Sequence, residues 1–175
     1  MNMKLLSILR RSAPAALALV LLAGCDRVSS TQQEEHTAHP IGHAECAACG
    51  MTVGNQPAPR GQVVHHDGTR AYLCSISDLI HYAGVPSRHG RIVATFVEVM
   101  DDGSDPAELA TESLPWARAA EASYVMGVAR PRIMGPPVLT YGAEDLAMEA
   151  AARFGGAAVS WEELQRGLHR QDQGR

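Results

Sequence analysis

The sequence predicts an α+β fold in which two related ββαβ units follow a signal peptide and a flexible tether. Three observations lead to this prediction. A short apolar run stands near the N-terminus, two stretches each combine strand patterns with one helix pattern, and a segment rich in Pro, Gly and Asp separates them. About 130 residues follow the tether, which suffices for one ordinary domain or two very small ones.

Residues 1–24 have the pattern of a secretion signal. The basic residues Lys4, Arg10 and Arg11 precede the apolar run "APAALALVLLAG", and small residues follow at the end of the run. A run of about a dozen residues is shorter than the roughly 20 that a helix needs to cross a bilayer. We therefore expect this segment to be removed and to take no part in the fold.

The signal ends in "LAGC", which resembles a bacterial lipobox. This resemblance implies cleavage before Cys25 and a lipid on its sulfur, so that acyl chains anchor the protein to the membrane. The next residue is Asp26, which in many Gram-negative bacteria retains a lipoprotein at the inner membrane. Residues 25–44 are polar without an apolar period, so we expect them to serve as lipid anchor and tether on the periplasmic side.

The charge balance and the absence of certain motifs narrow the possible classes of function. The formal charge is −4, and it falls to −7 when the three cations of the signal are removed. This acidic balance argues against nucleic acid as a partner. The sequence has no phosphate-binding glycine loop, no H-E-x-x-H motif and no nucleophile arranged with a His and a carboxylate, so we predict that the protein is not an enzyme.

Residues 45–102 form the first predicted ββαβ unit. Residues 61–68 and 69–75 have strand patterns and meet at Asp67-Gly68, a dipeptide favoured in tight hairpins. A helix is predicted next, with Ser75 or Ser77 as its N-cap and Gly84 as its end. Residues 91–100 are largely apolar on both faces, which is typical of a strand inside its sheet.

Residues 103–120 are predicted to be a joint, and residues 121–168 to be the second ββαβ unit. Its expected elements are strands at 121–128 and 136–142, a helix at 143–156, a strand at 157–161 and a short helix at 160–169. The segments "AYLCSISDLIHYAG" and "VLTYGAEDLAMEAAARFGG" share an apolar strand, a small residue, Asp-Leu, a helix and a glycine. We interpret this correspondence as an internal duplication.

Cysteine usage points to a sulfur site. With Cys25 assigned to lipid, three cysteines remain, Cys46, Cys49 and Cys74, whereas an exported domain stapled by disulfides holds an even number. Two thiolates at the spacing of Cys46 and Cys49 can hold one ion, because a tight turn brings both sulfurs to the same side. At the same spacing they can also close into a disulfide in an oxidising compartment.

Several kinds of site could use this C-x-x-C motif. A c-type haem requires His directly after the second cysteine, and Gly50 stands there. A thioredoxin-like couple requires a helix that begins at the motif, which the glycines and prolines of residues 50–61 disfavour. Structural zinc stays open, since Cys74 with His65 or His66 would complete a Cys3His set.

A Cu(I) site is the remaining interpretation, because thiolate and thioether sulfur select this soft ion. Met51 lies two residues after Cys49, and Met126 and Met134 flank a loop rich in Gly and Pro. Met148, by contrast, lies within a predicted helix and is expected to pack. We therefore predict metal ligands among Cys46, Cys49, Met51, Cys74, Met126 and Met134.

An ordered set of motifs resembles the NosL family. The set comprises the lipobox, "CGM", "GQVV" followed by "DG", "SISDL", "VATFVEVMDDG" and "YVMGVARPRIMGPPVLTYG", over most of residues 43–162. The resemblance implies two related ββαβ units and one Cu(I), delivered with membrane-side partners to the copper-sulfide centre of nitrous oxide reductase. The family fold is also similar to part of an organomercury lyase, which leaves a bond-cleaving enzyme as a formal alternative.

The resemblance also implies ligands. The Cys and Met of the family's "CGM" fall on Cys49 and Met51, and the methionine of its later "GMG" segment falls on Met134. This chain departs from the pattern, because it adds Cys46 and Cys74 and has Ile133 where glycine is usual.

We therefore expect a periplasmic, lipid-anchored Cu(I) metallochaperone that serves nitrous oxide reductase or its assembly proteins. We expect its copper loading to require a reduced Cys46–Cys49 pair. The alternatives are a zinc-stabilised lipoprotein adaptor and a periplasmic thiol oxidoreductase.

Overall fold

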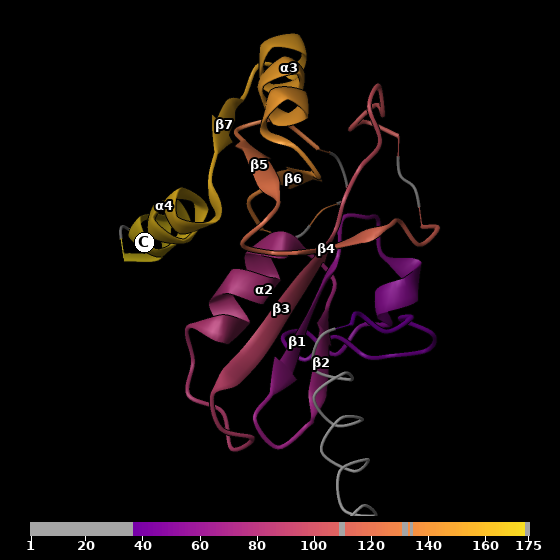
Figure 1. The fold of residues 1–175 in the computed structure, drawn as a ribbon, viewed down its shortest axis with the longest axis vertical. Helices are drawn as coiled ribbons and strands as arrows, with labels where there is room; N and C mark the ends of the chain where they lie inside the picture. Colours follow the sequence, from indigo (N-terminus) through magenta and orange to yellow (C-terminus); the bar gives the residue numbers. More distant parts are fainter. Residues whose placement is uncertain (1–36, 109–110, 131–132, 134, 174–175) are drawn as a thin grey trace, which may run out of the picture. The chain divides into compact units, whose positions relative to one another are not determined.

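The structure is a computed structural model that describes residues 37–108, 111–130, 133 and 135–173. The predicted signal peptide, the lipidation site Cys25 and the candidate ligand Met134 lie outside the described residues. Within the described part, strands and helices combine in an α+β fold with two antiparallel sheets, which confirms the predicted class (Figure 1).

The first sheet contains β1 (Gly61–His65), β2 (Arg70–Leu73), β3 (Ile92–Glu98) and β4 (Trp116–Arg118), in the order β2-β1-β3-β4. β1 and β2 form the predicted hairpin, and Gly68 takes a positive φ of 82° in its turn. β3 lies between β1 and β4, as its two apolar faces predict. β4 was not predicted, and it falls within the segment expected to be a joint.

Helix α2 (Ile76–Ala83) begins directly after β2. Ser75 is its N-cap, because the Ser75 hydroxyl accepts a hydrogen bond from the backbone N–H of Asp78 at 3.1 Å. Ile76, Leu79 and Ile80 recur at helical spacing and are buried. Each such side chain contributes about 1.5–3 kcal/mol of hydrophobic stabilisation, so α2 and the end of β2 are firmly held.

The second unit repeats this plan. It contains β5 (Ser123–Met126), β6 (Val138–Tyr141), α3 (Glu144–Phe154) and β7 (Ala157–Val159), with strand order β6-β5-β7. In both units the first strand is flanked by the second and third strands, so the two units have the same strand arrangement (Figure 1). Gly155 ends α3 in the left-handed conformation, at φ 76°.

Helix α4 (Trp161–Gln173) follows β7 and begins with a capping box. The Ser160 backbone N–H donates to Glu163 Oε2 at 2.9 Å, and the Glu163 N–H donates to Ser160 Oγ at 3.3 Å. Leu164 and Leu168 of α4 join the apolar cluster that contains α2 and the first hairpin. A second cluster fills the space between α3 and its sheet, with Val125, Leu139 and Ala147 among its members.

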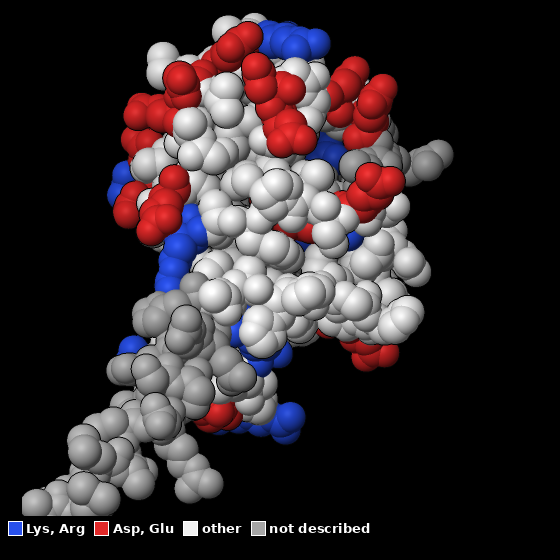
Figure 2. Space-filling view, turned by 45° about the vertical axis from the view of Figure 1, so that its right-hand side comes forward, with Lys and Arg blue, Asp and Glu red and all other residues white. Residues whose placement is uncertain are grey.

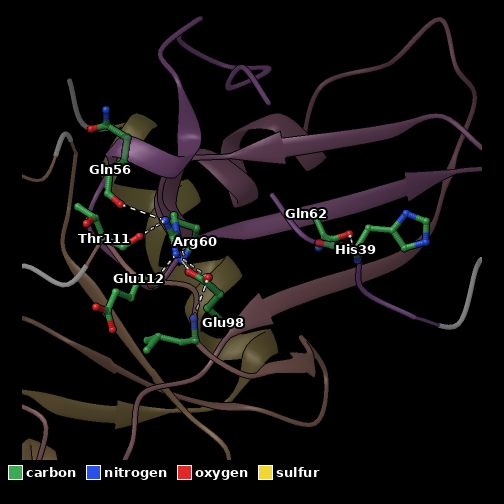
Figure 3. A network of polar contacts seen from close by, with 8 residues as sticks. His39, Gln56, Arg60, Gln62, Glu98, Thr111 and Glu112 are labelled. Carbon is green, nitrogen blue, oxygen red and sulfur yellow. Dashed lines mark hydrogen bonds and ion pairs between the residues drawn. The ribbon is translucent and has the colours of Figure 1, made fainter. Parts of the chain in front are cut away.

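A buried ion pair ties the predicted joint to the first sheet (Figure 3). Arg60 Nε and Nη2 donate to Glu98 Oε2 and Oε1, each at 2.7 Å, and both side chains are at most 1% exposed. The same guanidinium donates to the carbonyl oxygens of Thr111 and Glu112 at 3.1 and 2.8 Å. The segment that precedes β4 is therefore fixed against the start of β1 and the end of β3.

The surface reflects the acidic composition. Figure 2 shows one face of the molecule, with carboxylates gathered over its upper part and a broad uncharged area below them. Among the described helices, none is long and apolar enough to cross a membrane.

Candidate metal centre

The C-x-x-C motif forms a tight turn beside the first sheet. The backbone N–H of Gly50 donates to the Cys46 carbonyl at 2.8 Å, and the Cys46 N–H donates to the Met51 carbonyl at 2.8 Å. Gly50 takes a positive φ of 76°, which this turn requires. The Ala47 N–H donates to the Tyr72 carbonyl at 2.9 Å and thereby attaches the turn to β2.

Cys74 meets this turn from the other side. It follows the last residue of β2 and precedes the N-cap of α2, so the strand end and the helix start together fix its position. Its sulfur lies 3.4 Å from the sulfur of Cys49, and its backbone N–H donates to the sulfur of Cys46 at 3.4 Å. The structure thus brings together the three cysteines that the sequence singled out.

The first turn of α2 adds a carboxylate to these sulfurs. Cys74 and Asp78 are four residues apart, and the Cys74 thiol donates to Asp78 Oδ2 at 3.1 Å. One ligand atom from each of Cys46, Cys49, Cys74 and Asp78 lies within 4.8 Å of the others. We call these four residues the Cys3Asp cluster.

The surroundings shift the pKa values of the two buried thiols, Cys46 and Cys74, in opposite directions. Burial raises the pKa of Cys46, but N–H donors from the backbone of Cys74, Ala48 and Cys49 outweigh it and hold the pKa of this thiol below its ordinary value. Burial, the Asp78 carboxylate and contact with the other two sulfurs all raise the pKa of Cys74. A metal ion at this site would therefore meet one thiol, Cys46, whose deprotonation is favoured by its surroundings, and one, Cys74, whose deprotonation is opposed.

Met51 lies beside the Cys3Asp cluster. It is half-buried and lines a small pocket together with Cys74, Asp78 and Ile133. The thioether thus belongs to the same corner of the molecule as the thiols. This is the location that its place in the sequence predicts.

Met126, a candidate ligand, and Met148, expected to pack, have different surroundings from Met51. Met126 is the last residue of β5 and packs against the apolar cluster that includes α4. A Cβ added at Gly167 of α4 would lie 3.5 Å from the Met126 sulfur, so this thioether faces the helix backbone. Met148, expected to pack, is 59% exposed on α3, and this expectation was wrong because the helix turns its Met148 face to solvent.

No histidine completes the site among the described residues. His65 is fully buried, and its ring nitrogens contact the Gly90 carbonyl at 3.0 Å and the Tyr82 hydroxyl at 2.9 Å. The fourth donor beside the three cysteines is Asp78. Sequence reasoning missed Asp78, although its spacing from Cys74 across the N-terminus of a predicted helix was a signal that could have identified it.

The donor set is suited to a soft metal ion. Three thiol sulfurs and a nearby thioether are the ligands that Cu(I) selects, whereas the single carboxylate oxygen suits a harder divalent ion such as Zn(II). A thioredoxin-like role has less support, since residues 50–60 form a 3-10 turn at Val53–Asn55 but no α-helix begins at the motif.

Comparison with known proteins agrees with this geometry. The NosL family model matches residues 38–169. The copper-binding lipoprotein NosL from Stutzerimonas stutzeri is 27% identical over 164 residues, which cover 91% of this chain and 84% of that protein. The crystal structure of the copper chaperone NosL from Shewanella denitrificans superposes with a TM-score of 0.61 at 22% identity, over 73% of this chain and 94% of that chain, and so shares its fold.

Proposed function

This chain belongs to the NosL family, and from that premise we propose that it is a lipid-anchored periplasmic protein that binds Cu(I) and carries it to a copper enzyme under assembly. The observation that supports this proposal most is the Cys3Asp cluster, which gathers three sulfurs within 4.8 Å of one another. Its relative from Stutzerimonas stutzeri is named a copper-binding lipoprotein. Neither that relative nor its structural neighbour is named as an enzyme.

The proposed ligands are Cys46, Cys49 and Cys74, with Met51 and Met134 as thioether donors. Met134 lies outside the described residues, but both of its neighbours lie close to the cluster. Ile133 lines the pocket of Met51 and Cys74, and a Cβ at Gly135 would lie 3.1 Å from Ser77 Oγ at the start of α2. This proximity supports Met134 more than Met126, whose sulfur faces α4.

The proposed client is nitrous oxide reductase or one of its assembly proteins, as the family resemblance implies. The lipobox at Cys25 and the following Asp26 support an anchor at the inner membrane, where a copper carrier would meet a periplasmic enzyme. The test is the copper content and activity of the reductase in cells that lack this chain and in cells that express its Cys49→Ser variant. Full copper loading in both would exclude this client.

Metal competition tests the copper proposal directly. Full-length protein in detergent, kept reduced and anaerobic, is titrated against a Cu(I)-specific chelator and then challenged with Zn(II). We expect one tightly bound Cu(I) that Zn(II) does not displace. The Met51→Leu variant should bind Cu(I) more weakly, whereas Met148→Leu, which changes an exposed methionine on α3, should bind like the wild type.

Asp78 supports a second candidate function, that of a zinc-stabilised adaptor. With the three cysteines it completes a four-donor set of the kind that holds structural zinc. Zinc retained against excess Cu(I), together with unfolding of the zinc-free protein, would favour the zinc-stabilised adaptor over the copper carrier.

A further inference from the structure

We infer that Cys49 and Cys74 form a reversible disulfide that closes the copper site, while Cys46 remains a thiol. This inference rests on the proposed copper function and adds the regulation of the same site. It assigns the redox-active pair to two cysteines that lie 25 residues apart in sequence, in place of the C-x-x-C neighbours Cys46 and Cys49.

The sulfurs of Cys49 and Cys74 already lie close together. The two sulfurs are 3.4 Å apart, so they must approach by about 1.4 Å to reach the S–S bond length of about 2.0 Å. All three cysteines are free in this structure. Cys49 is exposed and Cys74 is 6% exposed, so one member of the pair can meet an oxidant and the other can act as its internal partner.

Cys46 is less suited to forming a disulfide. It is only 3% exposed, and its sulfur accepts hydrogen bonds from backbone N–H groups, including that of Cys74 at 3.4 Å. A disulfide to Cys46 would weaken this sulfur as an acceptor and disturb the buried hydrogen bond from the Cys74 N–H. The bond between Cys49 and Cys74 leaves this hydrogen bond in place.

The reaction is a thiol–disulfide exchange with an external disulfide as oxidant. The Cys49 thiolate attacks one sulfur of the external disulfide, breaks its S–S bond and releases one thiolate. The Cys74 sulfur then attacks the Cys49 sulfur, passes its proton to the Asp78 carboxylate at 3.1 Å and releases the second thiolate. The protein loses two electrons, the external disulfide becomes two thiols, and the protons from Cys49 and Asp78 return to the released thiolates.

Closure of this bond removes two of the three thiolates from the proposed copper ligands. Loss of an outer partner alone lowers metal affinity by about 10- to 100-fold, so loss of two direct sulfur ligands should lower the Cu(I) affinity by more than about 100-fold. Bound Cu(I), conversely, should protect both cysteines from oxidation. The exported protein would then accept copper only when a reductant keeps this pair open.

Peptide mapping distinguishes the possible pairs. Metal-free full-length protein in detergent is equilibrated with oxidised glutathione, acid-quenched, alkylated and digested with trypsin. Cys46 and Cys49 share the tryptic peptide 28–60, Cys74 lies in the peptide 71–88, and cleavage after Arg27 removes Cys25 with the N-terminus. We expect a cross-link between the two peptides, with fragmentation assigning it to Cys49. A bond within peptide 28–60, or no protein disulfide, would overturn the inference.

Variants and copper binding complete the test. Cys46→Ser should keep the cross-link, and Cys49→Ser should lose it; a cross-link that survives in Cys49→Ser would join Cys46 to Cys74 and contradict the assignment. Fragmentation of the wild-type cross-link decides the pair even if a variant does not fold. Oxidised protein that binds Cu(I) as tightly as reduced protein would refute the regulation, whereas reduced protein that fails to bind Cu(I) would refute the proposed function itself.

Discussion

Cys46 and Cys74 show how local partners give the same side chain different properties. Both thiols are buried, yet backbone N–H donors around Cys46 lower its pKa, whereas burial and the adjacent Asp78 carboxylate raise the pKa of Cys74. The difference arises from the turn at Cys46–Gly50 and from the helix start after Cys74. Metal binding at this site should therefore release protons, and more of them should come from Cys74 than from Cys46.

Asp78 should distinguish hard from soft metal ions. Replacing it with Asn removes the only carboxylate of the Cys3Asp cluster and keeps the size of the side chain. We expect the Zn(II) affinity of Asp78→Asn to fall by about 10- to 100-fold, because a zinc ion uses the fourth donor. The Cu(I) affinity should change by less than about threefold, because sulfur ligands dominate the binding of Cu(I).

Competition with metal-specific chelators measures both affinities on full-length Asp78→Asn. Asp145→Asn, an exposed residue in the first turn of α3, is the matched control and should change neither affinity. A loss of Cu(I) affinity as large as the loss of Zn(II) affinity would show that the carboxylate belongs to the copper site.

The β1–β2 hairpin contains a charge with a predictable pH dependence. The Thr69 N–H donates to Asp67 Oδ1 at 2.9 Å, and His89 Nδ1 lies 2.9 Å from Asp67 Oδ2. These partners, the Thr69 N–H foremost, lower the pKa of Asp67 from its ordinary value of 3.8 to about 2. The stability that ionised Asp67 adds is thus present above about pH 4 and is lost as the pH falls through about 2.

We expect wild type to be more stable than Asp67→Asn at pH 6, and the difference to shrink as the pH falls from 4 to 2. Urea unfolding followed by circular dichroism at a series of pH values measures this difference. A constant difference across the series would mean that the Asp67 charge does not stabilise the hairpin.

Among the elements, β3 and the segment before β4 depend on the buried Arg60–Glu98 pair. Replacing Glu98 with Gln leaves the Arg60 charge without a compensating carboxylate at a site that is 1% exposed. Removing one partner of a buried pair costs about 3–5 kcal/mol of unfolding free energy. We expect Glu98→Gln to lose stability in this range, as measured by urea unfolding.

The double variant Arg60→Met/Glu98→Leu is the informative control for this prediction. It removes both charges together, so it should be less destabilised than Glu98→Gln. A single variant within about 0.5 kcal/mol of wild type would show that solvent or another group compensates Arg60.

For the whole molecule, the sequence predicted the features that depend on local chemistry. Asp67-Gly68 marked the hairpin turn, Ser75 marked the start of α2, and the apolar faces of residues 91–100 marked an internal strand. The class and the repeated order of elements followed from these signals. The three cysteines of the cluster were likewise identified by their type and by the lipid expected on Cys25.

The features that the sequence did not reveal depend on contacts between distant segments. β4 has only three residues, too few for a strand period, and is placed by its pairing with β3 and by the Arg60–Glu98 pair. The short distance between Cys49 and Cys74 arises where the C-x-x-C turn attaches to β2. No spacing rule along the chain predicts such a contact.

X-ray absorption at the copper edge tests the central claim most directly, because it reports the atoms bound to the metal. Full-length protein is loaded anaerobically with one equivalent of Cu(I), and the Cys74→Ser and Met148→Leu variants are measured beside it. The account predicts a first coordination shell of sulfur alone, fewer sulfurs in Cys74→Ser and no change in Met148→Leu. A shell with nitrogen or oxygen ligands in the wild type, or a Cys74→Ser spectrum identical to the wild type, would contradict a copper centre built on the sulfurs of the Cys3Asp cluster.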